Sequence, residues 1–164
     1  MINTRPKRFS GESYCLFPNV LNADETVAVR SMLDEALEEQ LPLPSRWHWE
    51  YDASTAGIDC ANIVGEPHTR ALPWLELCRH PRILDAVASV LEPNLVLMYS
   101  SVVVKPPGES QAVAWHQDNN YWPGVHGTDV VTVWLAIDDA DAGNCAMEVI
   151  PGSHREYWEF DTVR

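Results

Sequence analysis

His116 and Asp118 stand two residues apart in the run Trp115-His116-Gln117-Asp118. In a β-strand, residues i and i+2 point to the same face, so a strand through Asp118 presents an imidazole and a carboxylate side by side. These are two of the three ligands of the 2-His-1-carboxylate triad, which holds Fe(II) and leaves positions open. The tripeptide alone arises often by chance, and a strand end with a surface histidine is the competing interpretation.

The residues around this pair favour a lined pocket. Of the seven tryptophans, Trp115, Trp122 and Trp134 cluster around it in the sequence. Core filling is the commoner explanation for any single tryptophan, but three near one candidate site suggest a pocket wall.

Composition bounds the class of protein. The chain has 164 residues, enough for one domain with a substantial core. No apolar run approaches the roughly 20 residues that cross a bilayer, and residues 1–10 have no apolar stretch typical of a secretory signal. The net charge of −13 argues against nucleic acid and anionic membranes as partners.

The four cysteines are scattered, with no C-x-x-C pair. This spacing favours reduced thiols and a cytoplasmic location over a disulfide framework or a zinc site. The cysteines are Cys15, Cys60, Cys78 and Cys145.

The first half of the chain predicts helices. Asn22 is the expected N-cap of a helix that ends near Gln40, and Glu25 is at the capping-box position. A second helix is expected from Pro81 to about Leu91. The predicted apolar stripes are Val29, Leu33, Ala36 and Leu37 in the first helix, and Ile83, Leu84, Val87, Val90 and Leu91 in the second; Tyr14, Leu16 and Phe17 are expected apolar anchors before them.

After Pro93 the sequence becomes typical of β-structure. Strands are expected over 95–99, 102–104, the segment ending at His116, 130–137 and 145–150, and a short strand is plausible around Trp47 and Trp49. Helices followed by strands predict one α+β domain over residues 1–164, with a helix-rich part at 1–93 and a β-rich part at 94–164.

Several motifs in this order resemble the phytanoyl-CoA dioxygenase family. They are Met98, Lys105-Pro106-Pro107-Gly108, Trp115-His116-Gln117-Asp118, the apolar run 130–137, and the segment from Gly143 to His154. The resemblance implies an Fe(II)- and 2-oxoglutarate-dependent dioxygenase on a double-stranded β-helix, a cupin-like jelly roll buttressed by N-terminal helices. Such an enzyme uses O2 to hydroxylate a small organic substrate.

The resemblance also implies roles for individual residues. His116 and Asp118 match iron ligands, and Met98, Gln117 and Trp134 match the 2-oxoglutarate pocket. On the expected strand 130–137, Trp134 shares a face with Thr132. Substrate contacts, or a plain rim, are expected from Asn119, Tyr121 and Trp122.

Two elements of the family pattern have no match in this sequence. In the family, a second histidine ligand and an arginine that binds the far carboxylate of 2-oxoglutarate follow the Pro-Gly-Ser-His turn, whereas this sequence ends at Arg164. We therefore expect an incomplete barrel whose open sheet edge favours self-association. His154 as third ligand, with Arg155 or Arg164 as the clamp, is the less favoured alternative, because a Gly-Ser turn makes His154 a loop residue.

Two other classes stay open. One is a catalytically inactive jelly-roll binding protein without a complete iron site. The other is a redox-inert metal-binding cupin with a third ligand from His48, His68, His126 or a second chain. The primary substrate is not fixed by the sequence.

Overall fold

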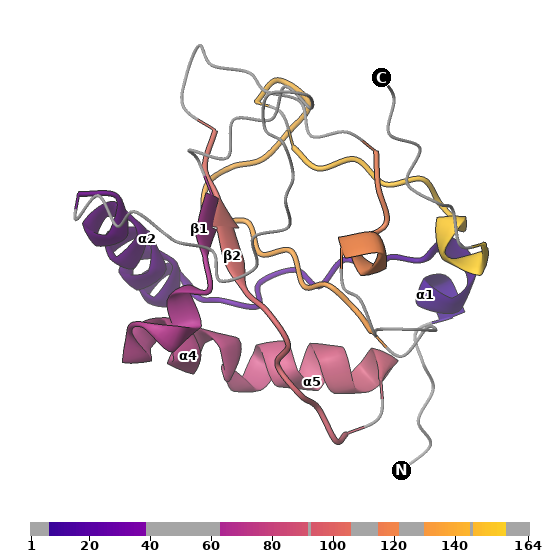
Figure 1. Ribbon diagram of the computed structural model, residues 1–164, viewed down its shortest axis with the longest axis horizontal. Helices are drawn as coiled ribbons and strands as arrows, with labels where there is room; N and C mark the ends of the chain where they lie inside the picture. Colours follow the sequence, from indigo (N-terminus) through magenta and orange to yellow (C-terminus); the bar gives the residue numbers. More distant parts are fainter. Residues whose placement is uncertain are drawn as a thin grey trace.

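A computed structural model of the chain describes residues 7–38, 63–91, 93–105, 115–121, 130–144 and 146–156. Its helices are α1 (Lys7–Glu12), α2 (Ala23–Glu38), α4 (Leu72–Cys78) and α5 (Pro81–Val90). Its strands are β1 (Ile63–Gly65) and β2 (Ser101–Val103), and its 3-10 turns are η2 (Pro67–Thr69), η3 (Asp118–Tyr121) and η4 (Ser153–Arg155). Figure 1 shows α2 beside the two strands, and α4 and α5 following each other along one side.

Helix α2 begins where the sequence predicts it. The Asn22 side-chain oxygen accepts a hydrogen bond from the Glu25 backbone N–H at 2.9 Å, and the Glu25 carboxylate accepts one from the Asn22 N–H at 2.7 Å. This reciprocal pair is a capping box, which satisfies two N–H groups at the helix start. Val29, Leu33 and Ala36 are buried as expected.

Glu25 also joins the starts of two helices. Its carboxylate accepts a hydrogen bond from Arg82 and lies 3.3 Å from Nε2 of His80, both at the start of α5. Helix α5 begins at Pro81, as predicted, and buries Ile83 and Val90. Glu25 therefore links the start of α2 to the start of α5.

The sheet joins the two halves of the chain. Strands β1 and β2 are antiparallel, with Val64 paired to Val102. Both valines are buried in one core cluster with Leu33, Ala36 and Trp74. Because β1 comes from the part expected to be helix-rich, residues 1–93 and 94–164 share a sheet and a core.

Helix α4 was not predicted. The sequence predicts no helix between Gln40 and Pro81, yet Pro73 lies in the first turn of α4. A first-turn proline loses no helical hydrogen bond, because the N–H groups of that turn have no partner within the helix. The helix buries Trp74 in the core.

Most of the predicted strands are wrong within the described residues. Positions 94–100, 130–136 and 146–150 carry no regular secondary structure, and β2 is limited to three residues. A run of apolar, β-branched residues forms a strand only when an adjacent segment pairs with it through backbone hydrogen bonds. The described part is thus α+β with a two-stranded sheet; the predicted strand at Trp47 and Trp49, and the position of Cys145, lie outside the described residues.

Two of the three expected apolar anchors after α1 are exposed, whereas Tyr14 is half-buried. Leu16 is 79% exposed and Phe17 is 42% exposed, so both predictions are wrong, as is Leu37, which is 42% exposed on α2. The end of α1 is held instead by the turn at 151–155: the Glu12 carbonyl accepts a hydrogen bond from the Gly152 N–H, and the Gly11 carbonyl accepts one from the Arg155 side chain. No described helix is both long and apolar enough to cross a membrane.

Candidate metal centre

His116 and Asp118 face each other. Nε2 of His116 lies 3.2 Å from Oδ1 of Asp118. The expected strand through Asp118 is wrong, because 115–117 has no regular structure and Asp118 opens η3. The predicted convergence of the two side chains is nevertheless confirmed.

The separation of the two atoms fits two ligands of one ion. Nitrogen and oxygen ligands lie about 2.1 Å from a small divalent cation, so neighbouring ligands at right angles are about 3 Å apart. The 3.2 Å between His116 Nε2 and Asp118 Oδ1 matches that spacing. Within the described ranges, no group of three His, Cys, Asp or Glu side chains is placed to hold an ion.

Thr132 is a site residue that the sequence reasoning did not name as one. Its hydroxyl donates a hydrogen bond to Oδ2 of Asp118. The segment that carries Thr132 is fixed further along, where Ile137 packs against the core and Asp138 pairs with Arg30 of α2. The available signal was alternation, since on the expected strand 130–137 Thr132 shares a face with Trp134, which was predicted as a site residue.

The surroundings of Asp118 favour its charged form. The hydrogen bond with His116 lowers the pKa of the Asp118 carboxyl below its usual value, and the hydrogen bond from Thr132 lowers it further. Partial burial opposes both effects. The carboxylate is therefore ready to bind a cation without first losing a proton.

Gln117 bonds to a turn further along the chain. Its side-chain nitrogen donates to the backbone carbonyls of Ser153 at 2.9 Å and Glu156 at 2.8 Å. His154, in the same turn, is exposed.

The other predicted site residues are placed as follows. Asn119 is half-buried in η3, while Met98 is 42% exposed and Trp134 is 48% exposed. Tyr121 closes η3, and Trp122, His48 and His126 lie outside the described residues. His68 bonds through Nδ1 to the Ser100 hydroxyl at 2.6 Å, which gives this histidine a structural partner.

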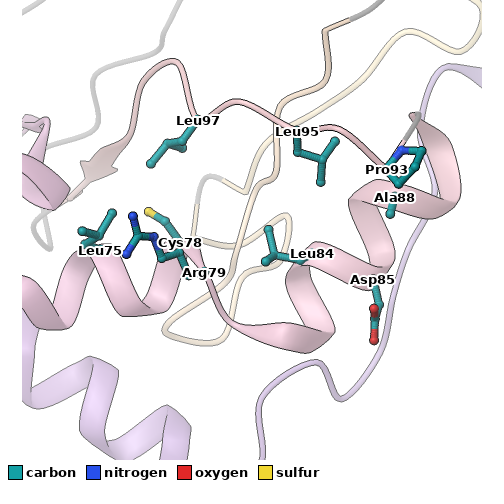
Figure 2. A pocket seen from close by; sticks show the side chains of 9 residues that line it. All are labelled: Leu75, Cys78, Arg79, Leu84, Asp85, Ala88, Pro93, Leu95 and Leu97. Atoms are coloured by element: carbon teal, nitrogen blue, oxygen red, sulfur yellow. The ribbon is translucent and has the colours of Figure 1, made fainter.

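A cavity of about 530 Å³ lies elsewhere, between α4, α5 and residues 93–97 (Figure 2). Its lining is mostly apolar and includes neither His116 nor Asp118. Burial raises the pKa of the Cys78 thiol in its wall, so this cysteine stays protonated. Among the described cysteines, Cys15 and Cys78 form no disulfide, and Cys60 and Cys145 lie outside the described residues.

The comparisons with known proteins agree on one family. The family model described as Phytanoyl-CoA dioxygenase (PhyH) matches residues 12–163. "Phytanoyl-CoA dioxygenase, peroxisomal" of Bos taurus is 31% identical over 48% of this chain and 24% of its own length. A "Probable alpha-ketoglutarate-dependent hypophosphite dioxygenase" of Stutzerimonas stutzeri is 34% identical over 56% of this chain and 32% of its own length.

A third relative is matched over more of the chain. "Ectoine dioxygenase" of Bordetella parapertussis is 19% identical over 91% of this chain and 48% of its own length. The chain thus spans between a quarter and a half of the length of these relatives. No solved structure matches the chain significantly.

Proposed function

Because this chain belongs to the phytanoyl-CoA dioxygenase family, we propose that it acts in Fe(II)- and 2-oxoglutarate-dependent hydroxylation of a small organic substrate, on a cupin-like jelly roll. The observation that carries the proposal is the 3.2 Å approach of His116 Nε2 to Asp118 Oδ1, within the residues that match the family. Relatives named for dioxygenase activity on unlike substrates support the reaction type and leave the substrate open.

The protein's own residues prepare the site. His116 and Asp118 would hold Fe(II), which together with 2-oxoglutarate and O2 supplies the oxidising chemistry when bound. Asp118 contributes an ionised carboxylate, and Thr132 holds Oδ2 so that Oδ1 faces the imidazole. Met98 and Trp134 would line the 2-oxoglutarate site and restrict water there, and Asn119, Tyr121 and Trp122 would contact the substrate.

A binding protein without catalysis is the second candidate. It is favoured by one observation: within the described part of the chain, His116 and Asp118 are joined by no third metal-binding side chain. The facial triad requires three ligands, so a pair alone holds iron less tightly.

One experiment separates the two. Two quantities are measured for the chain and for Asp118→Ala: anaerobic Fe(II) binding, and succinate release from 2-oxoglutarate with and without Fe(II) and O2. Release that needs Fe(II), O2 and Asp118 supports the dioxygenase. Fe(II) binding that depends on Asp118, without succinate release, identifies the binding protein. Wild-type protein that binds no Fe(II) contradicts the dioxygenase and favours a binding protein without an iron site.

A further inference from the structure

Gln117 lies between the two proposed ligands in the sequence, and its side chain bonds to another segment, the turn at 151–156. An amide NH2 group has two hydrogens to donate. In Gln117 it donates to two carbonyls of one turn, those of Ser153 and Glu156, at 2.9 and 2.8 Å. With both donors engaged, this NH2 group is committed to the turn.

The turn is itself held in place by α1. The Gly152 N–H donates to the Glu12 carbonyl at 3.0 Å, and Nη2 of Arg155 donates to the Gly11 carbonyl at 2.9 Å. Gly152 has φ of 81°, a conformation that a residue without a Cβ adopts at little cost. Figure 1 shows the turn at 153–155 directly beside α1. A continuous set of hydrogen bonds therefore runs from α1 through the turn to Gln117.

We infer that Gln117 is a positioning residue: it fixes the backbone of 116–118 to the turn at 151–156 so that His116 and Asp118 are held facing each other. Segment 115–117 has no regular secondary structure to hold it. The Gln117 bonds supply one restraint on this segment, and the Thr132 bond to Asp118 supplies a second. The expectation that Gln117 lines the 2-oxoglutarate pocket stays a prediction.

The identity of the metal that His116 and Asp118 bind rests on the proposed function, but the anchoring of their backbone by Gln117 does not. Residues that orient metal ligands typically change affinity or activity by about 10- to 100-fold when they are lost. Since Gln117 acts through the backbone on both ligands at once, its loss should weaken metal binding without removing a ligand.

The test uses two substitutions and a matched control. Gln117→Glu and Gln117→Met keep the length of the side chain and remove both donors. Asn144→Asp is the control, because it removes a comparable amide donor, to the Asp139 carbonyl, in a different turn. Arg155→Met loosens the same turn from its α1 side.

The first measurement is amide hydrogen exchange without metal. Both Gln117 variants should exchange faster at 115–118 and 151–156 than wild type, while α2 and α5 keep their protection. Arg155→Met should do the same at 151–156, and Asn144→Asp should leave both segments unchanged. If the amides of 115–118 and 151–156 exchanged in the Gln117 variants at the same rate as in wild type, the inference would be overturned.

The second measurement is anaerobic titration with Co(II), a visible spectroscopic probe for the Fe(II) site. The Gln117 variants should lose about 10- to 100-fold in affinity, with an altered absorption spectrum, and Asn144→Asp should bind as wild type does. Faster exchange with unchanged Co(II) affinity and spectrum would also overturn the inference. Wild-type protein that binds no Co(II) would instead refute the proposed function, while exchange still decides the anchoring.

Discussion

The Thr132 hydroxyl donates a hydrogen bond to Oδ2 of Asp118, while Nε2 of His116 faces Oδ1 of the same carboxylate. One carboxylate is thus oriented by two segments, one of them fourteen residues further along the chain. Because a carboxylate offers two oxygens to different partners, Thr132 can fix Asp118 without competing for the oxygen that faces the imidazole.

Thr132→Val should therefore raise the pKa of Asp118 toward its ordinary value, since one of the hydrogen bonds that favour the ionised form is lost. Asp118, with its lowered pKa, stabilises the fold above its unfolded-state pKa, and this contribution is lost as pH falls through the folded value. Thr132→Val should therefore lose less stability than wild type as the pH falls. NMR titration of the Asp118 carboxyl measures the pKa, with Thr69→Val as a control that loses a hydroxyl bonded to the Glu66 carbonyl. An unchanged pKa in Thr132→Val would contradict the assignment.

Asn22→Ala should lower the free energy of unfolding by about 1 kcal/mol, because the cap of α2 is lost. Urea unfolding followed by circular dichroism measures this. Asn94→Ala, at an exposed position outside the helices, is the control and should change stability little. Equal effects in the two variants would show that the capping box contributes nothing of its own.

Acid should weaken the junction between α2 and α5. The hydrogen bond from the Asn22 backbone lowers the pKa of Glu25, and His80 and Arg82 lower it further, while burial opposes them. A lowered pKa means that the stabilisation is present above the unfolded value and disappears as pH falls through the folded one. Urea midpoints measured from neutral pH down to about pH 2 should therefore fall less steeply in Glu25→Gln than in wild type. Parallel curves would refute this.

Trp74→Ala should destabilise the chain by about 3–5 kcal/mol, because the indole is buried between α4 and the sheet. Trp115→Ala is the matched control: this indole is 62% exposed and its loss should change stability little. Thermal unfolding of both variants compares them directly. A Trp74→Ala protein as stable as Trp115→Ala would mean that the core lies elsewhere.

Local patterns predicted local structure well. The Asn22–Glu25 capping box and the Pro81 helix start need only neighbouring residues, and both formed as expected. His116 and Asp118 meet even though residues 115–117 form no strand, because two side chains only two positions apart need no longer element to bring them together.

Features that depend on distant residues were missed. Pairing of β1 with β2 joins residues about forty positions apart, and no local signal marked 63–65 as a strand. The direction of the Gln117 side chain depends on a turn thirty-six residues away, and the contact of Thr132 depends on how its segment returns to Asp118. The alternation of residues along an expected strand predicts which side chains share a face. It does not predict which distant residues that face contacts.

The dissociation constant for Fe(II), measured anaerobically by calorimetry, tests the central claim most directly. Wild type, His116→Ala, Asp118→Ala and His154→Ala are compared, the last removing an exposed histidine from η4. Loss of a direct ligand should exceed the effect of losing an orienting residue, so the first two variants should bind more than about 100-fold more weakly than wild type. His154→Ala should bind as wild type does. Unchanged affinity in His116→Ala or Asp118→Ala, or a comparable loss in His154→Ala, would contradict the account.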